Sequence, residues 1–499
     1  MTLARWLVIA LALAAAGLAL WRLEGARAGV ARVALDAGPP ATLWRLPGAG
    51  PAPVVVIAHG FAGSRPLMEG FALAAARAGY LAVTFDFAGH GRNPVPMSGD
   101  VTRVEGTTRV LMDEVQAVTD AALALPDADG RVALVGHSMA SDIVVRQAIR
   151  DPRVGAVVAV SMFSAAVTAD QPRNLLMIPG EWEGFLSQAA LDALHLADPA
   201  AGWGQTVGDP AAGTARRAVQ APAVEHVGVL YSATTLRETV AWLDAAFGRA
   251  SEAAVPMRGG WVAILLVAVV AAGWPLAALM RGWRAARPPA PVPLRAFAVL
   301  AGGAALAVPL ALAPFDTRFL PVLVADYLAL HFALYGLVVL GGALGLGVWR
   351  PGPAGLGGLA VAGAVAAFGI GVFGMALDAY VANFWPAGPR WPIVAAMAAG
   401  AVPFMVADQV LTEGGRAPLW RALAARGAAL GSLGLAVALD FERLFFLIII
   451  LPVILLFFVL FGTAGGWAGR ATWRPVAVGA GLGLYLGWAL GVTFPLFAA

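Results

Sequence analysis

The sequence predicts two regions of different fold class: an α/β domain with a mostly parallel sheet, followed by an all-α bundle of membrane-spanning helices. In residues 28–250, short apolar runs alternate with helical patterns. From about residue 260 the chain is hydrophobic almost to its end. The whole chain of 499 residues is 60% hydrophobic and only 13% charged, far from the averages of soluble proteins. Much of it is therefore expected to lie in lipid.

The first apolar stretch covers residues 6–21, between Arg5 and the pair Trp21 and Arg22. About 16 residues is short for a membrane span, so this stretch fits either an uncleaved anchor or a cleaved secretory signal. We expect residues 1–27 to form an N-terminal transmembrane signal anchor, with the cleaved signal as the alternative. Both the anchor and the cleaved signal would export the segment that follows, provided that Arg5 stays on the cytoplasmic side.

Seven short apolar runs predict the strands of the first domain, residues 28–250. They are Val30–Leu35, Val54–Ala58, Leu81–Phe85, Val132–Val135, Val154–Ser161, Leu175–Ile178 and Arg217–Val219. Helical patterns fall between most of them. Because such strands are apolar along their whole length, the sheet is expected to be covered by helices on both faces.

Residues 256–499 predict a C-terminal transmembrane domain of about eight helices. The expected spans lie near 260–280, 296–313, 321–347, 355–377, 391–411, 424–440, 444–462 and 475–497. Alternate loops are rich in arginine, beginning with the loop that holds Arg281, Arg284, Arg287 and Arg295. By the positive-inside rule these loops are cytoplasmic. The sequence thus predicts a multi-pass protein of the cytoplasmic (inner) membrane, with residues 28–250 on the extracytoplasmic side.

The composition excludes several chemistries. The sequence contains no cysteine and no lysine, so all 33 basic residues are arginines. Thiol nucleophiles, Schiff bases, Ser-Lys dyads and phosphate-binding lysines are therefore excluded. The net charge of +3 is small and the arginines are scattered, which argues against a nucleic-acid partner. We find no metal-ligand spacing and no dinucleotide fingerprint in a usable context, and we expect no cofactor.

Ser138 is the candidate nucleophile. It follows the apolar run Val132–Val135 through Gly136 and His137, and a helical pattern follows it. This arrangement is typical of a sharp strand-to-helix turn that holds a serine hydroxyl at the end of a parallel sheet. In such a turn the backbone N–H of the next residue, Met139, points to where an oxyanion would form.

A serine needs a general base, and in this type of turn the base and its acid follow the serine in the order acid, then histidine. Three histidines follow Ser138. His331 lies in a predicted span and His195 in an amphipathic helix, whereas His226 lies in a loop after a strand. We therefore predict His226 as the base, with a surface loop histidine as the alternative.

The candidate acid follows the strand Leu175–Ile178. Glu183, three residues past Gly180, is our choice, because an acid in that loop can hold the imidazole of a histidine in the next loop. Glu181 and then Asp209 are the alternatives. For each of these candidates the alternative is a solvated loop residue with no catalytic role.

A second oxyanion donor is expected from a loop after an earlier strand. The run Val54–Ala58 leads into His59, Gly60 and Phe61, and the backbone N–H of Phe61 is the candidate donor. We interpret His59 as structural. The turn Phe85–Arg92 contains Asp86, Gly89, His90 and Gly91, and we interpret it as scaffold, with direct substrate contact as the alternative.

Together these motifs resemble the α/β-hydrolase superfamily, in particular its lipase, esterase and dienelactone-hydrolase-like branches. The resemblance covers about residues 28–250. It implies that Ser138 is the nucleophile, His226 the base and Glu183 the acid, with Phe61 and Met139 forming the oxyanion hole. Ala140 departs from the glycine usual at the end of the turn, and Arg92-Asn93 stands where a serine is commoner.

The sequence therefore predicts a membrane-integrated extracytoplasmic serine hydrolase that cleaves an ester or related acyl bond through an acyl-enzyme. Its substrate is expected to be a small-molecule or lipid acyl compound. One alternative is an acyltransferase to a membrane-borne acceptor, and another is a non-catalytic hydrolase-like module that regulates a transporter-like bundle. Asp326, His331 and Asp408 lie in predicted spans, and Asp378 lies near the outer end of one, where we expect it under the domain of residues 28–250. These residues either line a polar cavity or form interhelical hydrogen bonds.

Overall fold

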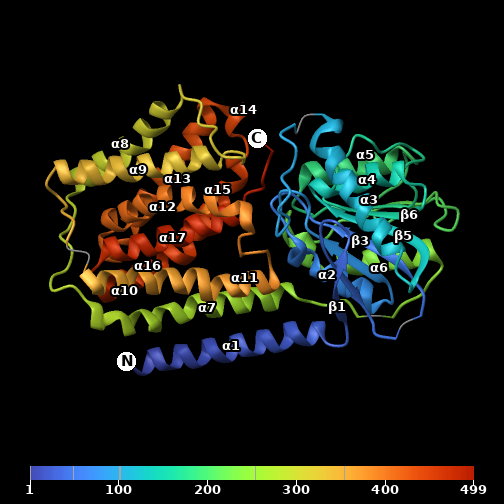
Figure 1. Ribbon diagram of the computed structural model, residues 1–499, viewed down its shortest axis with the longest axis horizontal. Helices are drawn as coiled ribbons and strands as arrows, with labels where there is room; N and C mark the ends of the chain where they lie inside the picture. The colour runs from blue at the N-terminus through green and yellow to red at the C-terminus, as the bar shows by residue number, and fades with distance from the viewer. Residues whose placement is uncertain (1, 49, 101–102, 253, 353–354, 499) are drawn as a thin grey trace.

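The computed structural model describes residues 2–48, 50–100, 103–252, 254–352 and 355–498. A domain with a central sheet lies beside one end of a bundle of long helices (Figure 1). The helix α1, Leu3–Arg27, runs along the bundle and ends at the sheet domain. The carboxyl terminus returns to the boundary between the two parts.

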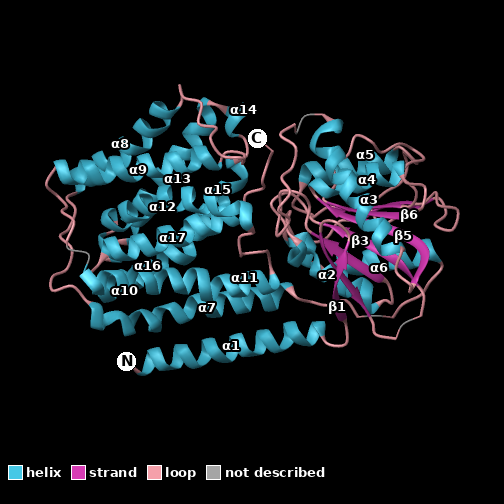
Figure 2. Ribbon diagram, in the orientation of Figure 1, coloured by secondary structure: helices cyan, strands magenta, loops and turns pink. Residues whose placement is uncertain are grey.

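The sheet domain has nine described strands. They are β1 Ala31–Asp36, β2 Pro40–Arg45, β3 Ala52–Ala58, β4 Leu81–Phe85, β5 Ala128–His137, β6 Val154–Val160, β7 Leu175–Ile178, β8 Thr206–Val207 and β9 Arg216–Ala218. Their order across the sheet is β1-β2-β4-β3-β5-β6-β7-β9-β8. Figure 2 shows the strands gathered in one domain, apart from the helical bundle. The pairs from β4 through β3, β5, β6 and β7 to β9 are parallel, and the pairs at both edges are antiparallel. The predicted fold class, an α/β-hydrolase type of sheet, is confirmed.

Helices cover both faces of this sheet. Successive residues of a strand point to opposite faces, and β3 is buried along its whole length. Val55 and Ile57 belong to a core with α2 (Glu69–Arg77) and α6 (Ala233–Phe247). Val54 and Val56 belong to a second core, with α3 (Arg109–Leu123), α4 (Met139–Arg150) and α5 (Gly184–His195). The doubly covered sheet explains why the central strands appear in the sequence as continuous apolar runs.

Two strands were not predicted. The strand β2 begins at Pro40 and mixes polar and apolar residues, and it pairs antiparallel with β1 and β4. Its sequence therefore lacks the uninterrupted apolar run that marks the parallel strands. The strand β8 has two residues, too few for a pattern.

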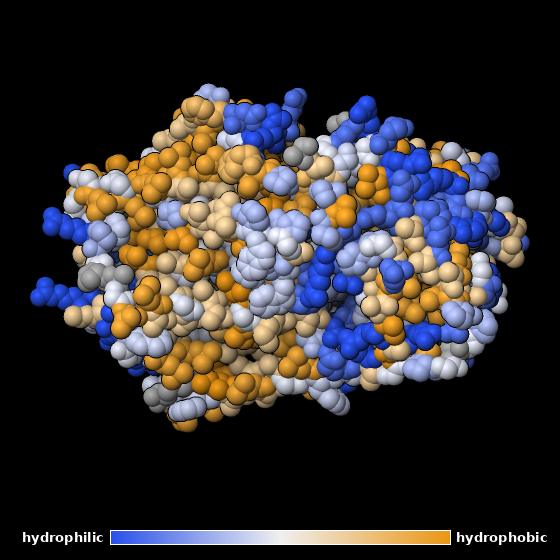
Figure 3. Space-filling view, in the orientation of Figure 1, coloured by the Kyte–Doolittle hydropathy of each residue, from blue (hydrophilic) through white to orange (hydrophobic). Residues whose placement is uncertain are grey.

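Within the described residues, nine helical stretches are long and apolar enough to cross a membrane, which suggests a multi-pass membrane protein. They are Leu3–Arg27, Gly259–Trp283, Leu294–Leu312, Ala325–Gly345, Gly355–Tyr380, Gly388–Leu411, Leu419–Leu439, Leu447–Thr472 and Pro475–Thr493. Hydrophobic residues dominate the visible surface of the bundle, and hydrophilic residues gather on the sheet domain and at the opposite tip (Figure 3). The first helix has 25 residues, longer than the 16-residue stretch read from the sequence, so its length is sufficient for a span.

Glycines bring two central helices of the bundle into close contact. In α17 (Pro475–Thr493), Gly479, Gly483 and Gly487 recur every four residues and face the backbone of α12 (Trp391–Leu411). A Cβ atom on any of the three would come within 2.4–2.5 Å of an α12 Cα atom. This is the small-residue packing that lets membrane helices approach closely.

The bundle and the sheet domain meet at the turn after β4. Arg390, at the start of the Gly388–Leu411 stretch, is fully buried and donates to the Gly89 carbonyl at 2.6 Å and to the Phe494 carbonyl. The tail after α17 continues the contact, since Leu496 N–H donates to the Gly89 carbonyl at 2.9 Å. The turn after β4 is therefore held directly against the bundle.

Candidate active site

Ser138 lies at the sharp turn between β5 and α4. Its backbone has φ 55° and ψ −120°, a conformation that L-residues rarely adopt. Gly136 permits the turn, because a Cβ atom there would lie 2.4 Å from the Ala140 carbonyl oxygen. The methyl group of Ala140 is itself fully buried in the core on the α4 side of the sheet. The turn therefore has room for the alanine at position 140. The position that must lack a side chain is Gly136.

Ser138, His226 and Glu183 form one hydrogen-bonded chain. Ser138 Oγ lies 2.8 Å from His226 Nε2, and His226 Nδ1 lies 2.5 Å from Glu183 Oε1. Glu183 directly precedes α5, and His226 lies in the loop between β9 and α6. The carboxyl ends of parallel strands share one edge of the sheet, which brings three residues distant in sequence together. This is the geometry of a nucleophile, a base and the acid that orients it.

Glu183 is held in place by two further donors. Ser161 Oγ–H donates to Glu183 Oε2 at 2.7 Å, and the Gly180 N–H donates to the same oxygen at 2.6 Å. Burial raises the pKa of Glu183, but the hydrogen bonds from His226, Gly180 and Ser161 outweigh it, and the net pKa is lower than usual. Glu183 is therefore ionised at neutral pH. Ser161 was not singled out from the sequence, although a polar residue ending an apolar strand was the signal available.

His137 supports the loop that carries the base. Its Nε2 lies 2.9 Å from the backbone carbonyl oxygen of His226. Burial, followed by the nearby His226, lowers the pKa of His137 to about 4. The ring is therefore neutral at pH 7, and an Nε2–H tautomer donates this hydrogen bond.

The other candidate acids and histidines form hydrogen bonds elsewhere in the molecule. Glu181 accepts the backbone N–H of Ala223 at 2.7 Å, and Asp209 accepts that of Ala211 at 2.9 Å. His195 ends α5, with its Nε2 3.0 Å from the Ala201 carbonyl oxygen. His331 lies inside the bundle, 3.1 Å from Ser432 Oγ.

The two candidate oxyanion donors flank Ser138. The N–H of Met139 is among the first amides of α4, which have no acceptor within the helix. The Gly60–Phe61 segment approaches from the other side, where a Cβ atom on Gly60 would lie 3.0 Å from Ser138 Cβ. A side chain at residue 60 would thus crowd the nucleophile.

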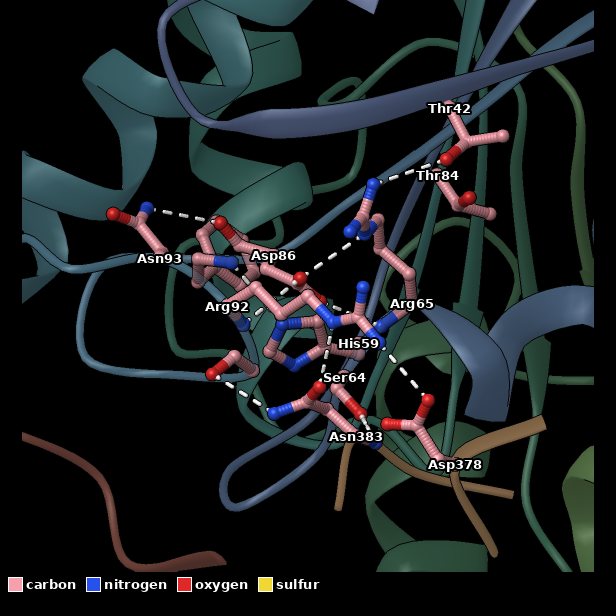
Figure 4. A network of polar contacts seen from close by, with 12 residues as sticks. Thr42, His59, Ser64, Arg65, Thr84, Asp86, Arg92, Asn93, Asp378 and Asn383 are labelled. Atoms are coloured by element: carbon pink, nitrogen blue, oxygen red, sulfur yellow. Dashed lines mark hydrogen bonds and ion pairs between the residues drawn. The ribbon is translucent and has the colours of Figure 1, made fainter. Parts of the chain in front are cut away.

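A polar network holds the loop after β3 against the turn after β4 (Figure 4). The Asp86 carboxylate accepts from the Arg65 N–H at 2.8 Å, from Arg65 Nε at 3.0 Å and from the Arg92 N–H at 3.1 Å. His59 Nε2 accepts the Phe87 N–H at 3.1 Å, and burial lowers the pKa of His59. These contacts are consistent with the scaffold role that we inferred from the sequence for His59 and for this turn.

The same network extends into the bundle (Figure 4). Arg92 donates to Asp378 at 2.9 Å and to the Asn383 side-chain oxygen at 2.8 Å. The Asn383 N–H donates to Ser64 Oγ at 2.8 Å. Asp378 therefore lies under the sheet domain, as expected, and its partner there is a residue of the sheet domain. In the part of the chain that the structure describes, no group of three or more His, Cys, Asp and Glu side chains is arranged to hold a metal ion.

Comparison with known proteins agrees with this fold. Residues 49–257 match the family described as serine aminopeptidase, S33. This segment is thus similar to a hydrolase family of the α/β-hydrolase type, in agreement with the resemblance of the motifs. A search of curated proteins returns no match for the chain.

Several solved structures are similar to the sheet domain. A protein of Thermus thermophilus is 19% identical, covering 43% of this chain and 96% of its own, with a TM-score of 0.31. A hypothetical protein of Pseudomonas aeruginosa is 15% identical over 44% of this chain and 94% of its own, with a TM-score of 0.33. An epoxide hydrolase of Vigna radiata is 24% identical over 29% of this chain and 41% of its own, with a TM-score of 0.22.

Proposed function

We propose that this chain is a membrane-integrated serine hydrolase that cleaves an ester or related acyl bond. The observation that carries the proposal is the hydrogen-bonded chain from Glu183 through His226 to Ser138, with distances of 2.5 Å and 2.8 Å. Ser138 stands on a strained strand-to-helix turn, where its hydroxyl is accessible and the first amides of α4 are close.

The mechanism follows from these positions. Ser138 Oγ attacks the acyl carbon while its proton moves to His226 Nε2, and Glu183 stabilises the imidazolium that forms. The N–H groups of Phe61 and Met139 stabilise the negative oxygen of the tetrahedral intermediate. The leaving alcohol takes the proton from His226, which leaves an acyl-Ser138 ester. Water then attacks this ester through the same base and releases the acid and the free serine.

The helices support integration in the cytoplasmic membrane with the sheet domain outside. The arginine-rich loops, such as the one holding Arg281 and Arg284, then lie in the cytoplasm. We propose that α1 stays as an anchor, because its buried Ala19 and Leu23 pack in one cluster with Val262 and Leu265 of α7 (Gly259–Leu279). Removal of α1 would expose this apolar contact.

The test is labelling with a fluorophosphonate, which reacts with activated serines. Membranes that contain the full chain are compared with those that contain Ser138→Ala or His226→Ala. A matched control is Ser164→Ala, because Ser164 lies in the same domain and its hydroxyl donates to Asp142. We expect labelling of the wild type and the control only. Labelling of Ser138→Ala at the wild-type level would refute the proposal.

Orientation is tested separately with reporters fused near Ser251 and near Arg284. These positions lie on either side of the stretch Gly259–Trp283. We expect them on opposite sides of the membrane, with Ser251 outside. Finding both reporters on the same side would exclude the proposed topology.

A further inference from the structure

The residue proposed as an oxyanion donor touches the helical bundle. The ring of Phe61 lies 5.2 Å, centroid to centroid, from the ring of Phe446. Phe446 directly precedes α15 (Leu447–Phe457), within the part of the bundle nearest the sheet domain. Because the backbone of Phe61 lies beside Ser138, the bundle forms one wall of the approach to the nucleophile.

The contact continues as a row of aromatic rings toward the outside of the bundle. The ring of Phe446 lies 5.7 Å from that of Phe445, which lies 5.6 Å from that of Phe441. We call these four residues, Phe61, Phe446, Phe445 and Phe441, the aromatic ladder. Phe441 is 57% exposed and Phe445 44% exposed, so the outer end of the ladder is open.

The open end joins the surface that lipid would cover. The exposed side chains Ile448, Ile449 and Val453 follow on α15. The stretch Leu447–Thr472 has a mean hydropathy of 2.9, the highest of the nine stretches. Exposed apolar patches of this kind mark contact with lipid or with an apolar ligand. An acyl chain can therefore pass from the bilayer onto the ladder without crossing water.

Charged groups stand at the same end of the bundle. Arg443, between Phe441 and Phe445 in sequence, forms an ion pair with Asp440 at 2.7 Å and donates to the Phe315 carbonyl at 2.8 Å. Arg318 pairs with Asp316 in the neighbouring loop at 2.7 Å. Ionised pairs of this kind belong at the level of lipid headgroups. The ester bond of a lipid, which lies just below its headgroup, would thus be near the depth of the ladder.

We infer that the substrate is a long-chain acyl ester dissolved in the bilayer, and that its acyl chain reaches Ser138 along the aromatic ladder. This inference rests on the proposed hydrolase function and specifies its substrate class. The chain lies on Phe441 and Phe445, then on Phe446 and Phe61, and the ester carbonyl arrives beside Ser138. A short, water-soluble ester has no acyl chain long enough to contact the outer rings, so these rings add nothing to its binding.

The absence of cysteine from the sequence permits a controlled experiment. Phe445→Cys is compared with Trp391→Cys, where Trp391 is a 51% exposed aromatic residue that begins α12 and lies outside the ladder. Each full-length variant is reconstituted in lipid nanodiscs and assayed before and after reaction with a negatively charged methanethiosulfonate. The substrates are 4-methylumbelliferyl palmitate and the corresponding butyrate.

We expect modification of Phe445→Cys to lower the palmitate-to-butyrate ratio of kcat/KM by about 10-fold, because the reagent places a negative charge where the acyl chain would lie. Modification of Trp391→Cys should leave the ratio unchanged. Each sample serves as its own control for folding. Phe441→Ser, which needs no reagent, should lower the same ratio in the same direction.

Two results would overturn the inference: an unchanged ratio in modified Phe445→Cys, or an equal fall in modified Trp391→Cys. Failure of the hydrolase proposal looks different. In that case neither ester is turned over by the wild type, or Ser138→Ala hydrolyses both as fast as the wild type does.

Discussion

The sheet domain and the helical bundle use buried polar residues in different ways. At the carboxyl edge of the sheet, Glu183 and His226 bond each other and lead to an accessible hydroxyl group. In the bundle, Asp408 pairs with Arg426 at 3.0 Å, and His331 lies 3.1 Å from Ser432. These pairs join neighbouring helices. Both regions place a histidine beside a serine, but Ser138 is only half-buried whereas Ser432 is fully buried. Access to the hydroxyl, and not hydrogen bonding alone, therefore separates the two pairs.

The sequence left open whether the ionisable residues of the spans line a cavity or join helices. The structure favours the second alternative for Asp408 and His331, whose partners Arg426 and Ser432 both lie on α13 (Leu419–Leu439). Asp378 pairs with Arg92 of the sheet domain and lines a cavity of about 380 Å³ between that domain and the bundle, so for this residue the first alternative is favoured. Position within a span was therefore insufficient to assign a role.

The largest expected effect breaks the reactive chain itself. Ser138→Ala should lower kcat/KM for an acyl ester by about 10⁵-fold, because no other group can form the acyl-enzyme. The measurement is steady-state hydrolysis by purified full-length protein. As a bundle counterpart, Ser432→Ala should change kcat/KM by less than about 3-fold. A comparable loss in both variants would remove the distinction between the two regions.

Glu183→Gln should lower kcat by about 10³-fold. The amide cannot stabilise the imidazolium of His226, and it places a donor where Ser161 and Gly180 already donate. KM for a short ester should change little. Glu181→Gln is the matched control, since Glu181 lies in the same loop but accepts the Ala223 N–H and not the histidine. Equal losses in both variants would contradict the assignment of Glu183.

His137 predicts how stability depends on pH. Its folded-state pKa is about 4, below the ordinary value of 6.5. Between these values the unfolded chain binds a proton that the folded protein does not, so the free energy of unfolding falls as the pH is lowered from about 7 to about 4. The fall due to His137 is at most about 3 kcal/mol.

Thermal unfolding in detergent at a series of pH values measures this contribution. His137→Gln retains a donor for the His226 carbonyl but does not titrate. The variant should therefore lose stability less steeply than the wild type below pH 6.5. Parallel curves for both proteins would show that His137 does not titrate as described.

The smallest expected effect concerns the boundary between the two regions. Arg390→Met leaves the carbonyls of Gly89 and Phe494 without this donor and should lower the free energy of unfolding by about 2 kcal/mol. Arg350→Met, at an exposed position of the bundle, is the control and should change it by less than about 0.5 kcal/mol. If the two variants unfold alike, Arg390 contributes nothing to the joining of the regions.

Much of the sheet domain was predictable from local patterns. The apolar runs located seven strands, and the chain order of serine, acid and histidine selected Ser138, Glu183 and His226 from several candidates. This was possible because the carboxyl ends of parallel strands meet at one edge, so residues after different strands converge there. The hydrogen bonds by which Ser161 holds Glu183 and His137 holds the His226 loop were not predictable, since they depend on the directions of side chains within those loops.

The bundle was predictable as a set of spans, but its contacts with the sheet domain were not. Phe446 packs on Phe61, and Arg390 reaches Gly89 across a sequence separation of 301 residues. Neither residue has a local pattern that distinguishes it from other aromatic or basic residues near the ends of spans. Such contacts depend on how the two parts pack against each other.

The sequence by itself determined the classes of both regions and the three residues now joined by hydrogen bonds. It also located the helices of the described residues that are long and apolar enough to span a membrane, because apolar periodicity and strand order are local properties. Only the tertiary structure decided what surrounds those residues. The aromatic ladder, the buried Arg390 and the Asp86 network join segments far apart in the chain, and side-chain packing between domains selects such partners by shape and polarity. Ser138 could thus be found from its own neighbours in sequence, whereas its path to the bilayer could be found only from its neighbours in space.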